Sequence, residues 1–259
     1  MALLEVIGLS KHFGGLRALD DVSFAVKERE LFSLVGPNGS GKTTLFNVVC
    51  GVLVPTAGRV VFQGQDITGK APFKVAQVGI GRTFQNVSLF AKMAVIDNVM
   101  VAMHCRRRAH LVAGIARTAR WRREEEACAN RAREILAFIG LSGREQEMAR
   151  NLPYGEQKRL EIARALAVDP KCILLDEPAA GVNTSELGVL TDVISRIHKS
   201  GITIVLVEHR MDLVMTISDR VHVLNNGRTI MTGTPSEVCS DPRVIEAYLG
   251  KGAASVADC

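Results

Sequence analysis

The sequence has no apolar run long enough to cross a membrane. A transmembrane helix needs about 20 consecutive apolar residues, whereas the apolar runs here are short, as at 202–207 (ITIVLV) and 172–175 (CILL). The first residues, MALLEVIGLSKHF, also lack the basic start and sustained apolar segment that are typical of a signal peptide. We therefore expect a chain that stays in the cytosol unless a partner holds it elsewhere.

Cysteine pairs with the spacing of a metal or redox motif are also missing. The six cysteines stand at positions 50, 105, 128, 172, 239 and 259, so none forms a CxxC pair, and no pair of histidines completes a zinc pattern. Thiols in a reducing compartment are the expected state. Cys50 and Cys172 lie among apolar residues, where we expect them to pack as small hydrophobic side chains.

Acidic residues are absent from the stretch 104–123, which holds seven arginines. Removing these seven charges from the formal net charge of +5 leaves −2, so the positive excess is local and argues against a general nucleic-acid-binding surface. Two interpretations stay open: contact with anionic headgroups or acidic loops of a membrane partner, or a solvated segment without a specific role. The arginines are Arg106, Arg107, Arg108, Arg117, Arg120, Arg122 and Arg123.

The composition is that of an ordinary globular chain, with 47% hydrophobic and 23% charged residues over 259 positions. Strand-like runs alternate with helical patterns in the second half, which is typical of a parallel α/β sheet. Residues 87–151 differ, because they hold an amphipathic helix and no strong strand pattern, and we interpret them as a helical subdomain inserted into an α/β core. We expect strands near 4–9, 22–26, 31–35, 59–62, 80–84, 171–176, 203–207, 221–224 and 229–232, and helices near 42–50, 95–103, 124–139, 155–167, 186–199, 211–217 and 244–249.

Residues 36–44, GPNGSGKTT, match the phosphate-binding pattern GxxxxGK[ST] and stand between an apolar run and a helical pattern. Glycines let successive backbone N–H groups turn inward around an anion, and the start of the following helix adds a positive dipole end. We expect Lys42 to reach the β- and γ-phosphates of ATP and the Thr43 hydroxyl to bind Mg²⁺. The predicted phosphate-binding residues are Gly36, Pro37, Asn38, Gly39, Ser40, Gly41, Lys42, Thr43 and Thr44.

A second acidic site follows another buried strand pattern, in KCILLDEP at 171–178. Hydrolysis needs a held metal ion and an activated water in addition to the phosphate loop. Asp176, at the strand end, is the predicted Mg²⁺ ligand. Glu177 is predicted to lie on the opposite side of the strand, because side chains alternate with a period of two, and there it would polarise the attacking water.

Two further polar residues follow predicted strands. Gln85 ends the run RTFQ and is a candidate Mg²⁺ ligand and sensor of the γ-phosphate, while His209 ends ITIVLVEH and could contact the γ-phosphate or orient water. Taken alone, neither residue is unusual at a strand end. Ligands of parallel sheets collect at the carboxyl ends of the strands, however, and all the candidates named so far follow strands on that side. We therefore expect their side chains to converge.

These motifs, in this order, resemble the ATP-binding cassette family of transporter ATPases, over nearly the whole chain from GLSKHFGGLRALDDVSF to PRVIEAYLG. The resemblance implies an α/β fold, with a P-loop NTPase (RecA-like) core, an N-terminal antiparallel β subdomain and an inserted α-helical subdomain. Within a single domain spanning 1–259, residues 1–86 and 152–259 would form the core with its β subdomain, and 87–151 the helical subdomain. The implied roles are adenine stacking for Phe13, the Q-loop for Gln85, the Walker B acid for Asp176, the catalytic base for Glu177, the switch histidine for His209, and catalysis with phosphate binding for Lys42.

The family's signature, which contacts the ATP of a partner cassette, corresponds here to NLPYGEQKRLEIARAL. Compared with the usual LSGGQ, Pro153 replaces a serine, Tyr154 a glycine and Glu156 a glutamine. Because proline cannot donate a hydrogen bond, recognition of the partner's γ-phosphate would depend on backbone amides near Gly155 and on the positive end of the helix. Pro153 is also compatible with a purely structural role, since proline is tolerated at a helix start.

The LPYG form, together with RTFQNVSLF, LDEPAAGVN and MDLVMTISDRVHVLNNG, resembles the branched-chain amino-acid uptake subfamily. This implies an ATP-binding subunit of an importer for branched-chain amino acids or related small polar solutes. The subunit would use ATP and Mg²⁺, pair with a second ATPase subunit and with membrane permease subunits, and sit peripherally at the cytoplasmic face of the membrane. No nucleic-acid partner is expected. The transported solute contacts other chains, so this sequence does not specify it.

Two alternatives remain at this point. A cassette ATPase that acts on nucleic acid or ribosomes usually carries two cassettes or a long coiled-coil insertion, and the sequence has neither. A different P-loop enzyme, a kinase or GTPase, would need a phosphoryl-acceptor site or a base-reading motif such as NKxD, which is not found.

Overall fold

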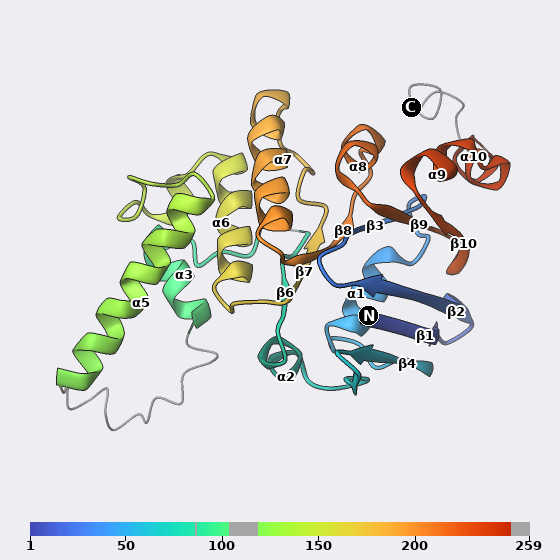
Figure 1. Ribbon diagram of the computed structural model, residues 1–259, viewed down its shortest axis with the longest axis horizontal. Coiled ribbons are helices and arrows are strands. Elements are labelled where there is room, and N and C mark those ends of the chain that lie inside the picture. Colours follow the sequence, from blue (N-terminus) through green and yellow to red (C-terminus); the bar gives the residue numbers. More distant parts are fainter. Residues whose placement is uncertain (86, 104–118, 250–259) are drawn as a thin grey trace.

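Two β-sheets form the framework of the molecule (Figure 1). The computed structural model describes residues 1–85, 87–103 and 119–249. The first sheet is antiparallel and has the strand order β2-β1-β4-β5. Its strands are β1 (Ala2–Phe13), β2 (Leu16–Lys27), β4 (Ala57–Phe62) and β5 (Gln65–Asp66).

The second sheet is mainly parallel and has the order β10-β9-β3-β8-β7-β6. All neighbouring strands from β9 to β6 pair in parallel, and β10 adds an antiparallel edge. The central strands are buried at every residue, as expected for short apolar runs in a sheet that is covered on both faces. Its strands are β3 (Leu31–Val35), β6 (Ile80–Arg82), β7 (Cys172–Asp176), β8 (Thr203–Val207), β9 (Arg220–Asn225) and β10 (Arg228–Gly233).

Helix α1 (Lys42–Val49) contributes to a core that it shares with both sheets. Leu45 and Phe46 of this helix pack in one cluster with apolar residues of β1 and β4 and with Cys172 and Leu174 of β7. Cys172 and Cys50 are both buried there, so the prediction that they pack as hydrophobic side chains is confirmed. The helix that starts at the phosphate loop is therefore fixed between the two sheets.

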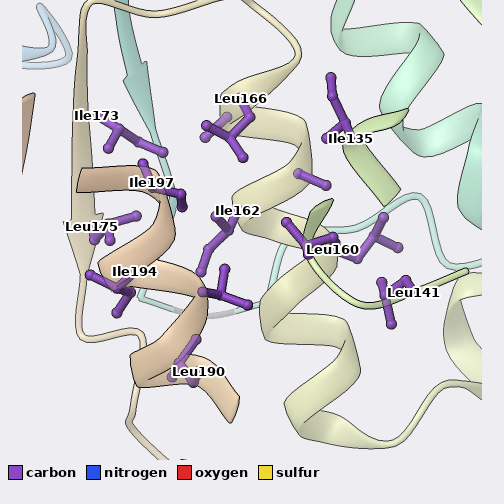
Figure 2. Packing of buried hydrophobic residues seen from close by; sticks show 14 of the residues in the cluster. Ile135, Leu141, Leu160, Ile162, Leu166, Ile173, Leu175, Leu190, Ile194 and Ile197 are labelled. Atoms are coloured by element: carbon purple, nitrogen blue, oxygen red, sulfur yellow. The ribbon is translucent and has the colours of Figure 1, made fainter. Parts of the chain in front are cut away.

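The opposite face of the parallel sheet is covered by helices (Figure 2). Ile173 and Leu175 alternate with the residues that face α1 and pack against α6 (Tyr154–Leu166) and α7 (Thr184–Lys199). Helices α3 (Val95–Met103) and α5 (Ala119–Phe138) extend the same cluster towards one end of the molecule, at the left of Figure 1. Near the other end lie α8 (Met211–Ile217), α9 (Pro235–Ser240) and α10 (Pro242–Leu249).

Several expected elements differ from the observed ones. Strand β6 ends at Arg82 rather than at position 84, and the short elements β5, α2 (Pro72–Gln77), η2 (Ala149–Asn151) and α9 had not been predicted. Among residues 1–85, 87–103 and 119–249, no helix has the length and apolar content that a membrane crossing requires. Of the arginine cluster, Arg106, Arg107, Arg108 and Arg117 lie outside the described residues, while Arg122 and Arg123 are exposed in α5.

Candidate active site

The predicted site residues follow four neighbouring parallel strands. In the order of the sheet, the phosphate loop follows β3, His209 follows β8, Asp176 ends β7 and Gln85 follows β6. Parallel pairing places all four carboxyl ends at one edge. The topology therefore brings residues that are far apart in the sequence to one place, the usual position of a ligand in such a sheet.

The phosphate loop wraps around the ammonium group of its own lysine. Lys42 is buried, and its Nζ donates to the carbonyl oxygens of Gly36 at 2.7 Å and of Pro37 at 3.1 Å. Burial lowers the pKa of Lys42, while the nearby carboxylates of Glu177 and Asp176 raise it. At Gly36 the backbone has a φ of +150°, and a Cβ would lie 2.0 Å from the carbonyl oxygen of Leu224. Only glycine fits there.

Asp176 is almost completely buried and forms an ion pair with Arg82. Its Oδ2 accepts from Nη2 of Arg82 at 3.1 Å, and its backbone N–H donates to Oγ1 of Thr83 at 3.1 Å. The other carboxylate oxygen, Oδ1, is buried and has no hydrogen-bond partner among the residues that the structure describes. Burial raises the pKa of Asp176, and Arg82 opposes that rise. The strand thus ends in a carboxylate with one unsatisfied oxygen.

Glu177 does not continue the strand, which corrects the prediction that strand alternation turns it to the opposite side. Strand β7 ends at Asp176, and Glu177 has a left-handed backbone with a φ of 48°. Both of its carboxylate oxygens have partners: Oε1 lies 2.6 Å from Nε2 of His209, and Oε2 accepts from Nε2 of Gln85 at 3.0 Å. A backbone turn, rather than the pleat of a strand, separates the two neighbouring acids.

Gln85 also differs from its expected position. It is exposed and stands three residues beyond the end of β6 instead of ending the strand. Its side chain nevertheless reaches Glu177, which in turn contacts His209. The three predicted residues Gln85, Glu177 and His209 therefore form one hydrogen-bonded chain across three strands.

A cavity of about 940 Å³ lies over these residues. Phe13, which is 45% exposed, stands at its wall, and the ammonium of Lys11 lies 5.0 Å from the centre of the Phe13 ring. Gly36, Pro37 and Asp176 are not among the residues that line it. The lining residues are Phe13, Leu16, Arg17, Ala18, Asn38, Gly39, Ser40, Gly41, Lys42, Thr43, Thr44, Gln85, Glu177, His209 and Asn226.

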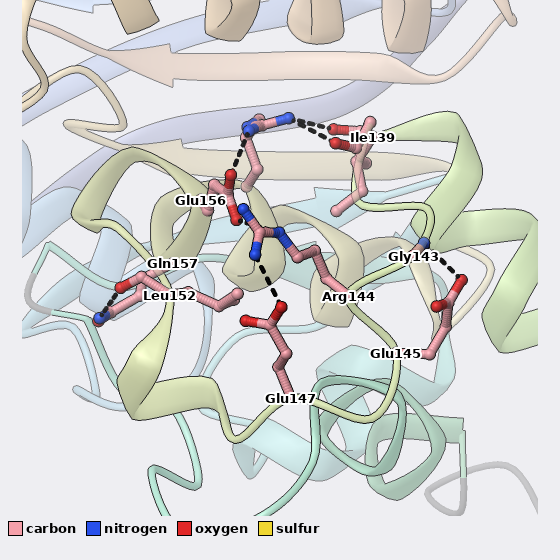
Figure 3. Close-up of polar contacts among 10 residues, drawn as sticks. Ile139, Gly143, Arg144, Glu145, Glu147, Leu152, Glu156 and Gln157 are labelled. Carbon is pink, nitrogen blue, oxygen red and sulfur yellow. Dashed lines mark hydrogen bonds and ion pairs between the residues drawn. The ribbon is translucent and has the colours of Figure 1, made fainter.

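The predicted signature residues lie elsewhere, at the start of α6. Pro153 precedes the first helical residue, Tyr154, and both are exposed, whereas Gly155 is buried. Within the described residues, no side chain caps this helix start. Glu156 lies 3.5 Å from Nε of Arg144 and 3.8 Å from Nη2 of Arg159, so the helix start is tied to the preceding segment (Figure 3). None of these residues lines the cavity of its own chain.

A protein-family model described as "ABC transporter" matches residues 19–180. This chain belongs to the ABC transporter family. A second model, "Branched-chain amino acid ATP-binding cassette transporter", matches residues 228–254 of this ABC cassette, which include β10, α9 and α10.

Curated relatives and solved structures agree with this assignment. The "High-affinity branched-chain amino acid transport ATP-binding protein LivG" of Salmonella typhimurium is 44% identical over 96% of this chain and 98% of its own length, and BraF of Pseudomonas aeruginosa is 41% identical over the same shares. A crystal structure of the ADP conformation of an ATP-binding cassette of an ABC transporter superposes with a TM-score of 0.85 at 36% identity, and covers 97% of this chain and 100% of that one. The P-loop α/β fold that the sequence predicted is confirmed.

The donor atoms of the ABC cassette suit a hard cation. Hydroxyl, amide and carboxylate oxygens are the ligands that Mg²⁺ prefers, and the three predicted ligands carry one of each. Thr43 and Gln85 line the cavity, and Asp176 ends β7 directly before the lining residue Glu177 with its Oδ1 unsatisfied. No cluster of three or more His, Cys, Asp or Glu side chains that could hold a metal occurs within the described ranges. The residues present therefore fit a magnesium ion bound together with phosphates.

Sequence reasoning missed several residues of this cassette site. Arg82 pairs with Asp176, and a charged residue inside a short strand was the available signal. Glu208 is buried beside His209 and accepts from the N–H of Ala179 at 2.7 Å, which links the ends of β7 and β8. Burial raises the pKa of Glu208. Its signal was an acid directly after the apolar run ITIVLV. Leu16, Arg17 and Ala18, at the start of β2, and Asn226, in the turn between β9 and β10, also line the cavity.

Proposed function

We propose that this chain is the ATP-hydrolysing subunit of an importer that takes up branched-chain amino acids through membrane partner subunits. The observation that carries the catalytic assignment is the position of Glu177, held between Gln85 and His209 beside the phosphate loop. The substrate class is supported by the names of the curated relatives and by the family model that matches the C-terminal residues. The relatives do not favour a cassette that acts on nucleic acid or ribosomes.

ATP binding begins at the cavity walls. Phe13 offers an exposed ring to the adenine, and the loop residues present their N–H groups to the phosphates. The Lys42 ammonium, which bonds carbonyl oxygens of Gly36 and Pro37, would exchange these neutral acceptors for the β- and γ-phosphate oxygens. This exchange favours the nucleotide because hydrogen bonds between charged partners are stronger than those to neutral carbonyls.

Hydrolysis is an in-line attack of water on the γ-phosphorus, with ADP as the leaving group. One carboxylate oxygen of Glu177 accepts a proton from the attacking water. Each oxygen keeps acceptor capacity beside its contact with Gln85 or His209. His209 and Lys42 then face the negative charge of the transferred phosphoryl group. Mg²⁺, held by Thr43, Gln85 and Asp176, would neutralise charge on the β- and γ-phosphate oxygens.

A second cassette completes the site in this proposal. The signature residues Pro153, Tyr154, Gly155 and Glu156 lie outside the chain's own cavity, so a second ATPase subunit, identical or different, would present them to the ATP bound here. Residues 1–86 and 152–259 act as the catalytic core and 87–151 as the helical subdomain. The assembly works with permease subunits, which place this chain peripherally at the cytoplasmic face of the membrane.

The catalytic role of Glu177 is tested by Glu177→Gln. We expect the variant to bind ATP with unchanged affinity and to lose at least about 100-fold in ATPase rate, because the amide keeps the shape of the side chain but cannot accept a proton. Nucleotide affinity and turnover are measured on the assembled transporter. Glu134→Gln, on the exposed face of α5, is the matched control and should behave as wild type. Wild-type turnover in Glu177→Gln would show that another group is the base.

The substrate class is tested separately in the native cells. Deleting the gene should reduce uptake of labelled leucine, isoleucine and valine from low external concentrations, and a plasmid copy should restore it, whereas the Glu177→Gln copy should not. Unchanged uptake of all three amino acids would contradict the proposed substrate and leave the ATPase assignment intact.

A further inference from the structure

Three charged side chains of α6 hold the segment that follows Gln85. Lys158, Glu161 and Arg164 are spaced by three residues and therefore share one face of the helix. Lys158 Nζ donates to the backbone carbonyl of Gln85 at 2.8 Å, and Glu161 Oε1 accepts from the backbone N–H of Ser88 at 2.7 Å. Arg164 donates from Nη1 to the carbonyl oxygen of the same Ser88. We call these three side chains the α6 clamp.

Two of the three charges in the α6 clamp, Lys158 and Glu161, are buried, and Arg164 is half-buried. Lys158 is 2% exposed and Glu161 is 5% exposed, and such groups are costly to bury unless hydrogen bonds compensate them. Each of the three side chains has a compensating hydrogen bond with the backbone of Gln85 or Ser88. The guanidinium of Arg164 also lies 5.0 Å from the centre of the Phe90 ring. Such bonds hold the segment at several points along α6.

The clamp acts on a residue of the active site. The backbone carbonyl of Gln85 bonds Lys158, while its side chain donates to Oε2 of Glu177. A shift of α6 would therefore displace Gln85 relative to the base. The same helix begins at Tyr154, in the signature that would face the ATP of a second cassette. One rigid element thus connects a residue beside this chain's base with the surface that the partner's nucleotide would meet.

We propose that Lys158, Glu161 and Arg164 are positioning residues, which fix Gln85 beside Glu177 and couple its position to the signature end of α6. This inference deepens the proposed function and rests on it for the role of Gln85. Glu161 is the residue to test, because one substitution can remove its charge and keep an acceptor oxygen, while another removes both. Glu161→Gln retains an oxygen for the Ser88 N–H, whereas Glu161→Ala has none.

The first measurement is residue-resolved amide hydrogen exchange on the full chain, which needs no ATPase activity. We expect the Ser88 amide to exchange at least about tenfold faster in Glu161→Ala than in wild type, since the amide loses the acceptor that Glu161 provides. In Glu161→Gln the rate should stay within about twofold. Glu134→Ala, at an exposed ion pair of α5, should change nothing. Equal Ser88 exchange in all four proteins overturns the clamp.

The second measurement is a double-mutant cycle on the ATPase rate of the assembled transporter. Glu161→Ala should lower kcat about tenfold with little change in KM, and Glu161→Gln should restore most of it. In a Gln85→Ala background, Glu161→Ala should cost less than about twofold, because a positioning residue has no effect once the residue it positions is gone. An equal loss in both backgrounds means that Glu161 only supports the fold, and overturns the proposal. If wild type shows no ATPase activity, the proposed function fails, and hydrogen exchange still decides whether the clamp exists.

Discussion

Glu177 has a hydrogen-bonding partner on each carboxylate oxygen, and neither partner belongs to β7, the strand that precedes it. Its left-handed backbone costs on the order of 1 kcal/mol for a residue other than glycine. Such strain persists only where the surroundings enforce it, here through the N–H of Glu177, which donates to the carbonyl of Val207 on β8. The strained turn places the carboxylate of Glu177, and not that of Asp176, in the cavity.

Another buried residue, His222, makes folding stability depend on pH. It lies on β9 next to the rings of Phe24 and Phe32, and Nδ1 and Nε2 contact the hydroxyls of Thr232 and Thr229. Burial, helped by the charge of Arg220, lowers its pKa from 6.5 to about 4. Between these two values the unfolded chain binds a proton that the folded chain does not bind, so stability falls as the pH decreases through this window.

For His222→Gln we expect a weaker dependence of stability on pH in that window. Between pH 6.5 and 4, the slope of the unfolding free energy against pH should be smaller in the variant by up to about 1.4 kcal/mol per pH unit, because glutamine does not titrate. This expectation holds whatever the stability of the variant at neutral pH. Urea unfolding at several pH values measures the slope for both proteins. Identical slopes would show that His222 is protonated in the folded state or that it titrates normally.

At the scale of elements, strands that are apolar along their whole length were predictable. The expected strands at 31–35, 171–176 and 203–207 match β3, β7 and β8 within one residue, since a strand buried on both faces needs a continuous apolar run. The longer β1 and β2 were only partly recognised. Their register shifts near Val6 and Leu9, and Gly8 and Asp21 have positive φ, so the apolar alternation that reveals a half-buried strand is interrupted.

The predicted end of β6 was wrong for a different physical reason. After Arg82 the hydroxyl of Thr83 accepts the N–H of Asp176 in place of a backbone carbonyl, so the ladder with β7 stops there. No residue in RTFQ indicates that a side-chain hydroxyl will replace a backbone carbonyl as the acceptor. The sequence therefore indicated which residues meet at the site, through the order of the strands, but not the turns that set the final contacts of Gln85 and Glu177.

The phosphate loop allows a matched test of two glycines. In Gly36→Ala the new Cβ would lie 2.0 Å from the carbonyl oxygen of Leu224, a backbone atom that cannot yield without moving β9. In Gly39→Ala the φ of +80° is strained, but nothing lies within 4 Å. We expect Gly39→Ala to cost about 1–2 kcal/mol of unfolding free energy and Gly36→Ala at least about 3 kcal/mol. Chemical denaturation measures both, and equal losses would mean that the loop relaxes around Gly36.

At the scale of the whole molecule, the fold places the cavity and the signature residues apart from each other. The cavity lies at the carboxyl edge of the parallel sheet, whereas the signature lies at the exposed start of α6, which packs with α3 and α5 in the helical cluster. The first N–H groups of any helix lack intrahelical partners, and no described side chain caps α6. Pro153 therefore supplies no cap for these donors, and in the proposed assembly an anion on another subunit would meet them at the positive end of the helix dipole.

Substitution of Pro153 separates stability from catalysis. In Pro153→Asp the new carboxylate should cap α6 and gain about 1 kcal/mol, which offsets the loss of proline's rigidity, so unfolding free energy should stay within about 1 kcal/mol of wild type. The same carboxylate occupies the N–H groups and repels a phosphate, so we expect the ATPase rate of the assembled transporter to fall about tenfold or more, with unchanged ATP affinity of the isolated chain. Pro153→Ser, which supplies a cap and a hydroxyl without charge, is the control and should keep its activity. If Pro153→Asp hydrolyses ATP as fast as Pro153→Ser, the start of α6 does not face a bound phosphate, and the second cassette must complete the site in some other way.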